Sequence, residues 1–547
     1  SPYDRKMFGN KVLHVGDRVA GVVAEEPEIA QKAISKIKVE YETLEPVLTI
    51  DQACTKDAPI LHNSHIDYVI GPDNIDNNKI DPREGKVIYQ FPIGGEPRKN
   101  LAASVDGGIG DVKKGFDEAD VIIEREYESA QVQCTPAEPH IVYTKMDGKR
   151  LIIHASTQVP WHVRRIVSML IGVNENNVRV VKERVGGGFG AKQDIVLEEV
   201  CSYLTYKTGR PILFRFTREE EFISSRTRHV MKIKVKLGAK KDGKLTAILM
   251  KVKANTGPYG SHCLTVPMNA CSKSLPLFLC DNVRFEVETY YSNIAPTGAY
   301  QGYGAPKGSF ALQTAVAELA QELGMDQFDL VEKNRVREGV MLEILRCLGE
   351  GREGTPAKVQ SCGLKAALEQ GTRKIKWGEK EISDHPDIKI GKGFAIIQQG
   401  SGLPGLDSSN AQIKMLFDGT FLLLTGGADL GTGLDTMAVK VAAESLCVSM
   451  EDISIISGDT DITPFDTGAY ASSGTFFTGN AVFRCAQNMH SQILESAAEI
   501  LKESKEDLKI SYPSTVVGKK GKVTFKEISA AVHGGEGRGQ LIASAGY

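Results

Sequence analysis

The residues of this sequence that could do chemistry gather first in one glycine-rich segment. VGGGFGAKQD, residues 185–194, contains four glycines and ends in Lys192, Gln193 and Asp194. Glycine lets the backbone approach a ligand closely, and free N–H groups ahead of a helix bind anions and polar ligand edges. The segment therefore predicts a ligand cradle built largely from backbone groups.

A nucleotide is the usual occupant of such a cradle, but two nucleotide motifs fit poorly. The P-loop requires GxxxxGK(S/T), and no segment satisfies it. The dinucleotide fingerprint GxGxxG fits only through Gly186, Gly188 and Ala191, and the following PILFRFTREEEF offers several charges where one ribose-binding acid is expected. For this segment alone, a dinucleotide loop and a purely structural turn both stay open.

Cysteine and histidine spacing argues against a metal held by protein side chains. The ten cysteines stand singly along the chain, so iron–sulfur clusters and zinc ribbons find no template. The eleven histidines form no HExxH pair. We expect no direct protein ligand to a metal, and we expect most of the cysteines to be small core residues in a reducing cytoplasm.

Three further segments share the layout of the glycine loop, a β run that breaks at small or polar residues before a helix: STQ at 156–158, GAYQGYGAPK at 298–307 and GGADLGTG at 426–433. A fourth segment, DTGAYASSG at 466–474, has small residues and hydroxyls directly before a helix. Each presents N–H groups at a helix start. Several such junctions predict a ligand larger than one phosphate, held from several sides.

The elements that position these junctions predict an α+β architecture. Residues 18–48 read as strand, helix and strand, HVMKIKVKLGA and KLTAILMKVKANTG read as a hairpin about KKDG, and 308–324 reads as a helix. We expect a small α/β domain over 1–65, a linker over 66–95, a mixed domain over 96–345, a linker over 346–361 and a second mixed domain over 362–547.

Composition narrows the classes of partner. The 547 residues include 66 basic and 69 acidic side chains, a net charge of −3, so neither nucleic acid nor an anionic membrane is expected. No apolar run reaches the roughly 18 residues that span a bilayer. The sequence opens on SPYDRKMFGN and closes on LIASAGY, a strand pattern cut short, so we expect a piece of a longer protein.

Taken together in their order, the five junctions resemble the molybdenum-binding subunit of the xanthine dehydrogenase and aldehyde oxidase family. GGGFGAKQ is similar to that family's GGGFGGKE, STQ to its STQ turn, GAYQGYGAPKG to its RGFGxPQ, and GGADLGTGLDT to its GGxEMGQGxxT. VLHVGDRVAGVVAEE resembles its small hammerhead domain. The resemblance implies two mixed molybdopterin-binding domains after that small domain, and a cradle for molybdopterin with a phosphate or cytosine-dinucleotide tail.

The resemblance also assigns residues to the cofactor. Gln158 takes the place of the glutamine that hydrogen-bonds the apical oxygen of the metal. Thr432 stands where the family has a glutamine, which puts a pterin contact there in doubt. The remaining cofactor residues that it implies are Gly187, Gly188, Phe189, Gly190, Gly302, Gly431, Gly433, Ser472 and Ser473.

Three substitutions against the family pattern bear on substrate. Gln193 stands where the xanthine enzymes carry a glutamate, Gln301 replaces the arginine of RGFG, and Tyr303 replaces its stacking phenylalanine. Neutral amides beside an aromatic face suit a nitrogen heterocycle such as a purine. The segments DLGTGLDT and GSGLPGLDSSN resemble those of bacterial selenium-linked purine hydroxylases. Selenium in place of sulfur as a ligand of the molybdenum therefore stays open.

The resemblance implies parts that the sequence lacks. The family's general-base glutamate lies in a VGE-like turn beyond residue 547, and Glu536 in HGGEGRG is better read as an exposed loop residue. Iron–sulfur (2Fe–2S) and FAD sites have no counterpart either, so both are expected on partner subunits.

Several functions stay open. An aldehyde oxidoreductase or a hydroxybenzoyl-CoA reductase relative shares the same motifs. A carbon monoxide dehydrogenase relative is disfavoured, because the GAYQGYG loop has no cysteine. A cofactor-binding fragment without activity of its own is the non-enzyme alternative.

Overall fold

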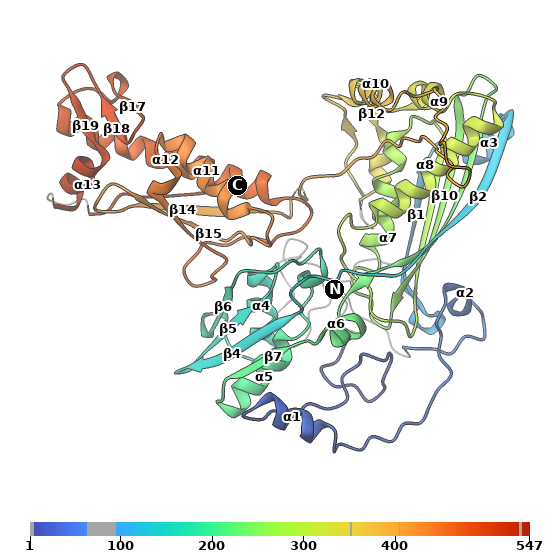
Figure 1. Ribbon diagram of the computed structural model, residues 1–547, viewed down its shortest axis with the longest axis horizontal. Coiled ribbons are helices and arrows are strands. Elements are labelled where there is room, and N and C mark those ends of the chain that lie inside the picture. Colours follow the sequence, from blue (N-terminus) through green and yellow to red (C-terminus); the bar gives the residue numbers. More distant parts are fainter. Residues whose placement is uncertain (1–4, 63–93, 350–352, 404, 535–538) are drawn as a thin grey trace.

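A computed structural model describes residues 5–62, 94–349, 353–403, 405–534 and 539–547 (Figure 1). The expected linker at 66–95 therefore lies almost entirely outside the described residues, and so does Glu536. None of the described helices is both long enough and apolar enough to cross a membrane.

The first described segment, 5–62, carries the helices α1 (Pro27–Ile34) and α2 (Ile50–Ala53). Helix α1 confirms the helix expected within 18–48, but the two flanking strands are wrong, since the described residues there form none. Several of their apolar side chains, among them Val19, Val39 and Tyr41, are exposed. An alternating sequence becomes a strand only when another backbone pairs with it, and no described segment does so here.

The next segment builds a twisted five-stranded sheet in the order β1-β11-β10-β9-β2. The expected hairpin is confirmed, because β9 and β10 pair antiparallel through KKDG, while β10 and β11 are parallel. Helices α7 and α8 pack on this sheet, and α8 confirms the helix expected at 308–324 (Figure 1). The bounds are β1 (Leu101–Ile109), β2 (Val121–Ser129), β9 (Val230–Ala239), β10 (Leu245–Gly257), β11 (Val283–Tyr291), α3 (Val112–Asp117), α7 (Thr265–Ser272), α8 (Ala305–Glu322) and α9 (Gln327–Asn334).

A second sheet, β6-β5-β4-β7, interrupts the first in sequence and packs on helices α4 and α5. Its strands β5 and β6 are parallel, so their carboxyl ends meet at one edge, where the STQ turn and the glycine loop follow. The bounds are β4 (Ile141–Asp147), β5 (Arg150–Ala155), β6 (Val178–Lys182), β7 (Ile212–Arg215), α4 (Pro160–Ile171), α5 (Glu198–Thr208) and α6 (Arg218–Ser224).

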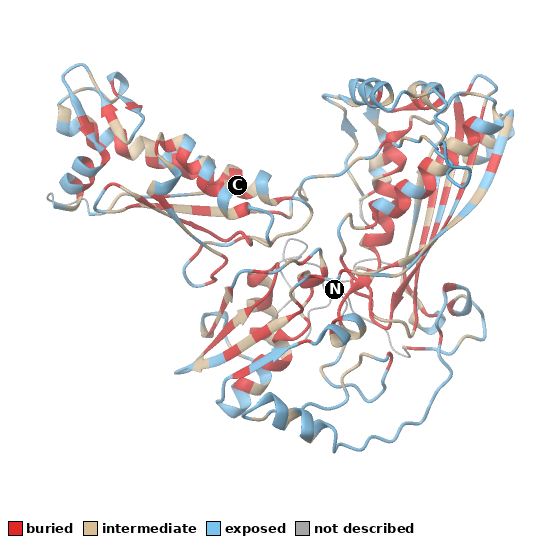
Figure 2. Cartoon of the chain, viewed as in Figure 1, coloured by how far each residue is buried: buried red, intermediate tan, exposed pale blue. Residues whose placement is uncertain are grey.

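The C-terminal segment forms a four-stranded sheet, β16-β15-β14-β20, covered by α11 and the 28-residue helix α12. In this segment, the buried residues, which are red in Figure 2, lie where these helices meet the sheet. The bounds are β14 (Asn410–Met415), β15 (Phe421–Thr425), β16 (Ile453–Ser457), β20 (Ile542–Gly546), α11 (Leu434–Leu446), α12 (Gly474–Leu501), α13 (Phe525–Gly534), and β17 (Lys509–Ser511), β18 (Thr515–Val517) and β19 (Lys522–Thr524) of a small three-stranded sheet.

Small elements complete the described chain. They are β3 (Val132–Gln133) paired with β8 (Thr227–Arg228), β12 (Met341–Leu342) paired with β13 (Ala357–Lys358), and α10 (Leu364–Lys374).

The C-terminal segment docks on the free edge of β6. Val181 and Asp459 form an antiparallel bridge, in which the Lys182 N–H donates to the Gly458 carbonyl at 2.9 Å and the Thr460 N–H donates to the Val180 carbonyl at 3.0 Å. The Arg179 guanidinium donates two hydrogen bonds, of 3.0 and 2.5 Å, to the Asp459 carboxylate. This junction brings the two halves of the chain together beside the STQ turn.

Candidate functional site

Three strand-to-helix junctions meet at the carboxyl end of the second sheet. The glycine loop follows β6, the STQ turn follows β5, and the GAYQGYG loop precedes α8. The Gln301 N–H donates to the Phe189 carbonyl at 2.8 Å, and a Cβ added to Gly190 would lie 2.7 Å from the carbonyl carbon and oxygen of Ala299. The loops therefore touch backbone to backbone.

The glycine loop has a backbone conformation that residues other than glycine rarely adopt. Gly187 and Gly190 have φ of +96° and +104°, and Phe189 between them has +54°. Within the described part of the chain, the N–H groups of Gly187, Gly188 and Phe189 donate to no acceptor. Free donors on a glycine turn form a concavity that suits an oxygen-rich or anionic ligand.

Gln158 is buried, with 3% exposure, and joins this loop to the C-terminal segment. Its side-chain oxygen accepts the Gly190 N–H at 3.0 Å, and its amide nitrogen donates to the Ala469 carbonyl at 2.6 Å. An amide nitrogen carries two hydrogens, so one remains for a ligand. A Cβ on Gly188 would come within 2.7 Å of the same side-chain oxygen, which explains the glycine there.

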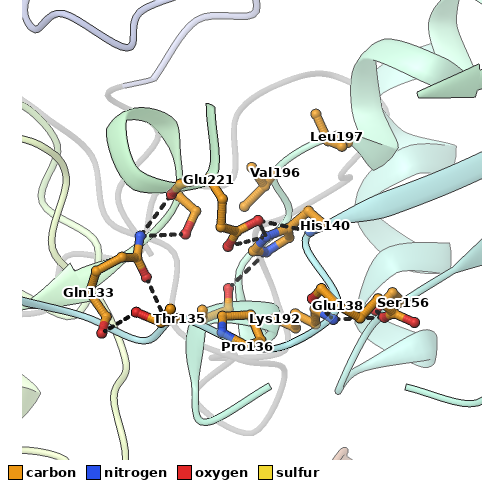
Figure 3. Close-up of polar contacts among 12 residues, drawn as sticks. Gln133, Thr135, Pro136, Glu138, His140, Ser156, Lys192, Val196, Leu197 and Glu221 are labelled. Carbon is orange, nitrogen blue, oxygen red and sulfur yellow. Dashed lines mark hydrogen bonds and ion pairs between the residues drawn. The ribbon is translucent and has the colours of Figure 1, made fainter. Parts of the chain in front are cut away.

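A largely buried ion pair links Lys192, next to the glycines of the loop, to Glu138 (Figure 3). Lys192 is 1% exposed, and its Nζ donates to the Glu138 carbonyl at 2.9 Å and to the Glu138 carboxylate at 2.8 Å. Burial lowers the pKa of Lys192, which the adjacent Glu138 counteracts in part. Burial alone would raise the pKa of Glu138, but Lys192 and the Ser156 hydroxyl hold it below its ordinary value.

A second buried pair lies beside the first (Figure 3). His140 Nδ1 lies 2.9 Å from a carboxylate oxygen of Glu221, and its Nε2 lies 3.2 Å from the Ala191 carbonyl. The Gln133 amide donates to the Glu221 carbonyl at 2.7 Å. The two pairs thus hold the backbone at Glu138 and Ala191, next to the glycine loop.

The expected substrate residues have different environments. Gln193 is partly exposed and Gln301 is exposed, and the side chain of neither makes a hydrogen bond among the described residues. Tyr303 is partly buried, and its hydroxyl hydrogen-bonds His262 Nδ1 and, at 2.7 Å, the Thr265 hydroxyl. The two amides are thus available to a ligand, whereas the Tyr303 hydroxyl is already engaged.

The GGADLGTG turn is shaped by one carboxylate. Asp429 accepts N–H groups from Gly431 at 2.8 Å, Gly433 at 3.3 Å and Asp435 at 3.0 Å. Burial would raise the pKa of Asp429, but these N–H donors keep it below its ordinary value. Gly431 and Gly433 have positive φ and open space where a side chain would be, and Thr432 between them is exposed.

The last expected junction lies at the start of α12. Ser472 is exposed with a φ of +55°, while Ser473 is buried and its hydroxyl donates to the Tyr470 carbonyl at 2.8 Å. A small cavity between this turn and the GGADLGTG turn is lined in part by Leu434, Ala469, Ser473 and Gly474.

These contacts connect two of the expected cofactor residues, Gln158 and Gly190, to the turn that holds Ser473. Gln158 bonds the glycine loop on one side and Ala469 on the other, and Ala469 lines the cavity shared with Ser473 and Leu434. Free N–H groups, a spare amide hydrogen and the start of a long helix are the donors that an oxo-metal centre with a phosphate-bearing pterin requires. The residues present fit that group. In the described part of the chain, no three His, Cys, Asp or Glu side chains gather to hold a metal.

Sequence reasoning missed several residues of this region. Asp194, Arg226, Ser261 and His262 form a polar cluster next to the glycine loop. The only sign of this cluster in the sequence was an acidic residue, Asp194, directly after Gln193. The partners of Asp194 lie 32 or more residues away and follow no periodic pattern. Asp429 was detectable, as an Asp two residues before a glycine at a turn.

Comparisons with known proteins identify the family of the chain. Residues 94–335 and 366–547 each match a molybdopterin cofactor-binding domain, and residues 2–45 match the a/b hammerhead domain of aldehyde oxidase and xanthine dehydrogenase. The chain is similar to the nicotinate dehydrogenase large molybdopterin subunit of Eubacterium barkeri, at 30% identity over 61% of this chain and 71% of that one.

Two further relatives extend over the whole chain. The "Probable hypoxanthine oxidase XdhD" of Escherichia coli is 55% identical over 100% of this chain and 58% of its own length. Quinoline 2-oxidoreductase from Pseudomonas putida 86 has the same fold, with a TM-score of 0.78 at 22% identity over 99% of this chain and 67% of that chain.

The chain belongs to the xanthine dehydrogenase and aldehyde oxidase family of molybdenum hydroxylases. Within that family it comprises the small hammerhead domain and two molybdopterin-binding domains. It spans 58% of the length of the relative that it matches at 55% identity.

Proposed function

We propose that this chain is the molybdenum-cofactor-binding part of a hydroxylase that oxidises a ring carbon of a purine-like or other N-heteroaromatic compound, using oxygen derived from water. The observation that carries the substrate class is the 55% identity, over the whole chain, to a protein named as a probable hypoxanthine oxidase. The neutral amides of Gln193 and Gln301, both without a partner among the described side chains, support it, because purine edges offer both donors and acceptors.

The chain's own residues bind and orient in this proposal. When bound, the cofactor supplies a molybdenum centre that exchanges electrons and oxygen with the substrate. Gln158 would donate its remaining amide hydrogen to the bound cofactor, and the free N–H groups of the glycine loop would hold the cofactor beside it. Gly302, Gly431, Thr432 and Gly433 border the pterin, and Ser472 and Ser473 at the start of α12 hold the phosphate end of the tail.

The substrate contacts the glycine loop through Gln193 and the GAYQGYG loop through Gln301. Gln193 and Gln301 hydrogen-bond the heterocycle, and Tyr303 offers its ring face. Because the Tyr303 hydroxyl is engaged by His262 and Thr265, its contribution to a ligand is packing.

The proposal includes parts that residues 1–547 do not supply. A general-base glutamate, a 2Fe–2S subunit and an FAD subunit complete the enzyme in the cytoplasm, without nucleic acid or membrane as partner. We also propose the domain division 1–65, 96–345 and 362–547, with linkers at 66–95 and 346–361.

Purification of the native protein with its partners, followed by elemental analysis and assay, tests the proposal. We expect close to one molybdenum per chain, and selenium alongside it if selenium replaces sulfur. Hypoxanthine and xanthine turned over in ¹⁸O-water with an artificial electron acceptor should yield labelled product. Oxidation of aldehydes in preference to purines would assign the chain to the aldehyde oxidoreductases. Reduction of an aromatic thioester would assign it to the hydroxybenzoyl-CoA reductases, and metal without turnover of any of these would leave a cofactor-binding fragment.

A further inference from the structure

The side chains of Asp194, His262 and Tyr303 form a row that runs from the glycine loop to the GAYQGYG loop. Asp194 directly follows Gln193, Tyr303 lies two residues after Gln301, and His262 lies between them. His262 Nε2 is 3.4 Å from Asp194 Oδ1, and His262 Nδ1 is hydrogen-bonded to the Tyr303 hydroxyl. The imidazole and phenol rings meet edge to face, with centroids 5.3 Å apart at 90°.

The Asp194 end of the row is rigidly held. Its carboxylate is buried and accepts Arg226 Nε at 2.6 Å and the Ser261 hydroxyl at 2.8 Å. Burial would raise the pKa of Asp194, but Arg226, His262 and Ser261 hold it well below its ordinary range. The carboxylate is therefore an anion that faces His262 Nε2 at 3.4 Å.

At the other end of the row, Tyr303 and His262 have backbone conformations that such residues normally avoid. Tyr303 has a φ of +44° and His262 has +56°, in the left-handed region that residues with a Cβ avoid. Two such residues that hydrogen-bond one another persist only when the surroundings over-determine them. Thr265 adds a second hydrogen bond, of 2.7 Å, to the Tyr303 hydroxyl.

We propose that His262 is a positioning residue that transmits the fixed orientation of Asp194 to the ring of Tyr303, and so aligns the aromatic face with the amides of Gln193 and Gln301. With Nε2–H directed at Asp194, Nδ1 is left as the acceptor for the Tyr303 O–H. The tyrosine oxygen then accepts from Thr265, so its hydroxyl is satisfied on both sides. The site selects flat rings through the Tyr303 face, without a hydrogen bond from that residue.

Only the statement that Tyr303 faces the substrate rests on the proposed function; the row itself does not. A first readout therefore needs no substrate. 3-Fluorotyrosine is placed at position 303 of the full chain, in complex with its native partners, and its ¹⁹F resonance is recorded. We expect one narrow line in the wild type. His262→Gly, which deletes the imidazole and tolerates the positive φ, should shift and broaden it.

Conservative rescue separates positioning from mere packing. Asparagine tolerates the left-handed region and carries an oxygen near the place of Nδ1, so His262→Asn should restore a single narrow line. His154→Ala, at a histidine on β5 that contacts Glu183 instead, is the matched control and should leave the line unchanged. A His262→Gly line identical to the wild-type line, or an Asn variant as broad as the Gly variant, overturns the proposal.

The second readout is kinetic. With a purine substrate, His262→Gly should raise KM by about tenfold and change kcat by less than about threefold, and His262→Asn should recover most of the loss. A fall in kcat at unchanged KM would also overturn the positioning role. If no purine is turned over by the wild type, the proposed function fails, while the ¹⁹F result still decides the role of His262.

Discussion

Gln158 and Ala469 are joined by two hydrogen bonds, although 311 residues separate them in the chain. The Gln158 amide donates to the Ala469 carbonyl at 2.6 Å, and the Ala469 N–H donates to the Gln158 carbonyl at 2.9 Å. The residue expected to contact the metal's oxygen ligand is therefore also a structural link between the two molybdopterin-binding domains.

Replacing Gln158 should cost stability at this link. Gln158→Ala leaves the Gly190 N–H and the Ala469 carbonyl without their side-chain partner, and each loss costs about 1–3 kcal/mol when the group stays buried. We expect a lower free energy of unfolding in urea, followed by the fluorescence of Trp161, which packs on Phe465 with ring centroids 5.5 Å apart at the same junction.

Gln321→Ala is the control for that measurement, because Gln321 is exposed on α8. Equal unfolding midpoints for Gln158→Ala and the control would refute the structural role.

The contact between the glycine loop and the GAYQGYG loop predicts the effect of adding a methyl group at Gly190. Gly190→Ala places a Cβ 2.7 Å from the Ala299 backbone and keeps a φ of +104°, so we expect destabilisation of more than about 2 kcal/mol and a loss of bound molybdenum. Gly393→Ala, where nothing lies within 4 Å, should retain wild-type stability and metal content. Thermal unfolding and plasma mass spectrometry measure both, and wild-type values for Gly190→Ala would contradict the close approach.

Lys307 makes stability depend on pH. Burial and the neighbouring Arg228 lower its pKa from 10.5 to about 7. Between these values the unfolded chain holds one more proton than the folded chain, so this group makes the free energy of unfolding rise with pH, by about 1.4 kcal/mol per unit. The destabilisation caused by burying the protonated Lys307 is complete below about pH 7. It disappears as the pH approaches 10.5, the ordinary pKa of a lysine.

Lys307→Met should remove this dependence. We expect urea unfolding of the variant to show a flatter stability profile from neutral to alkaline pH, and Lys244→Met, at an exposed lysine, to follow the wild type. A constant difference between Lys307→Met and the wild type across that range would show that the amine keeps its ordinary pKa.

Asp429 should control cofactor retention. Asp429→Ala frees the N–H groups of Gly431, Gly433 and Asp435, so the turn loses its shape, and we expect several-fold less molybdenum after dialysis. Asp429→Asn keeps one acceptor oxygen and should lose less. Asp418→Asn, which alters a carboxylate that accepts hydrogen bonds from Thr420 in another turn, is the control, and metal loss equal to that of Asp429→Ala would indicate a nonspecific effect.

The sequence predicted the junctions but not the contacts between them. Each expected turn, from STQ to DTGAYASSG, lies between a strand or extended segment and a helix, because local glycine content and periodicity encode such turns. Burial of Lys192 was not predictable from composition, since a lysine in a polar loop is ordinarily solvated and Glu138 lies 54 residues away. The pairing of Asp194 with Arg226 was hidden for the same reason. The strands expected within 18–48 failed because alternation reports a propensity and not the presence of a partner.

The docking of residues 458–460 on β6 has a consequence for synthesis of the protein on the ribosome. Strand β6 is an edge strand, and the backbone that covers it lies almost 280 residues later in the chain. A nascent chain thus carries an open strand edge through much of translation, and such edges recruit other chains. Chaperone binding during elongation should accordingly concentrate on chains that have passed residue 182 but have not yet reached residue 458.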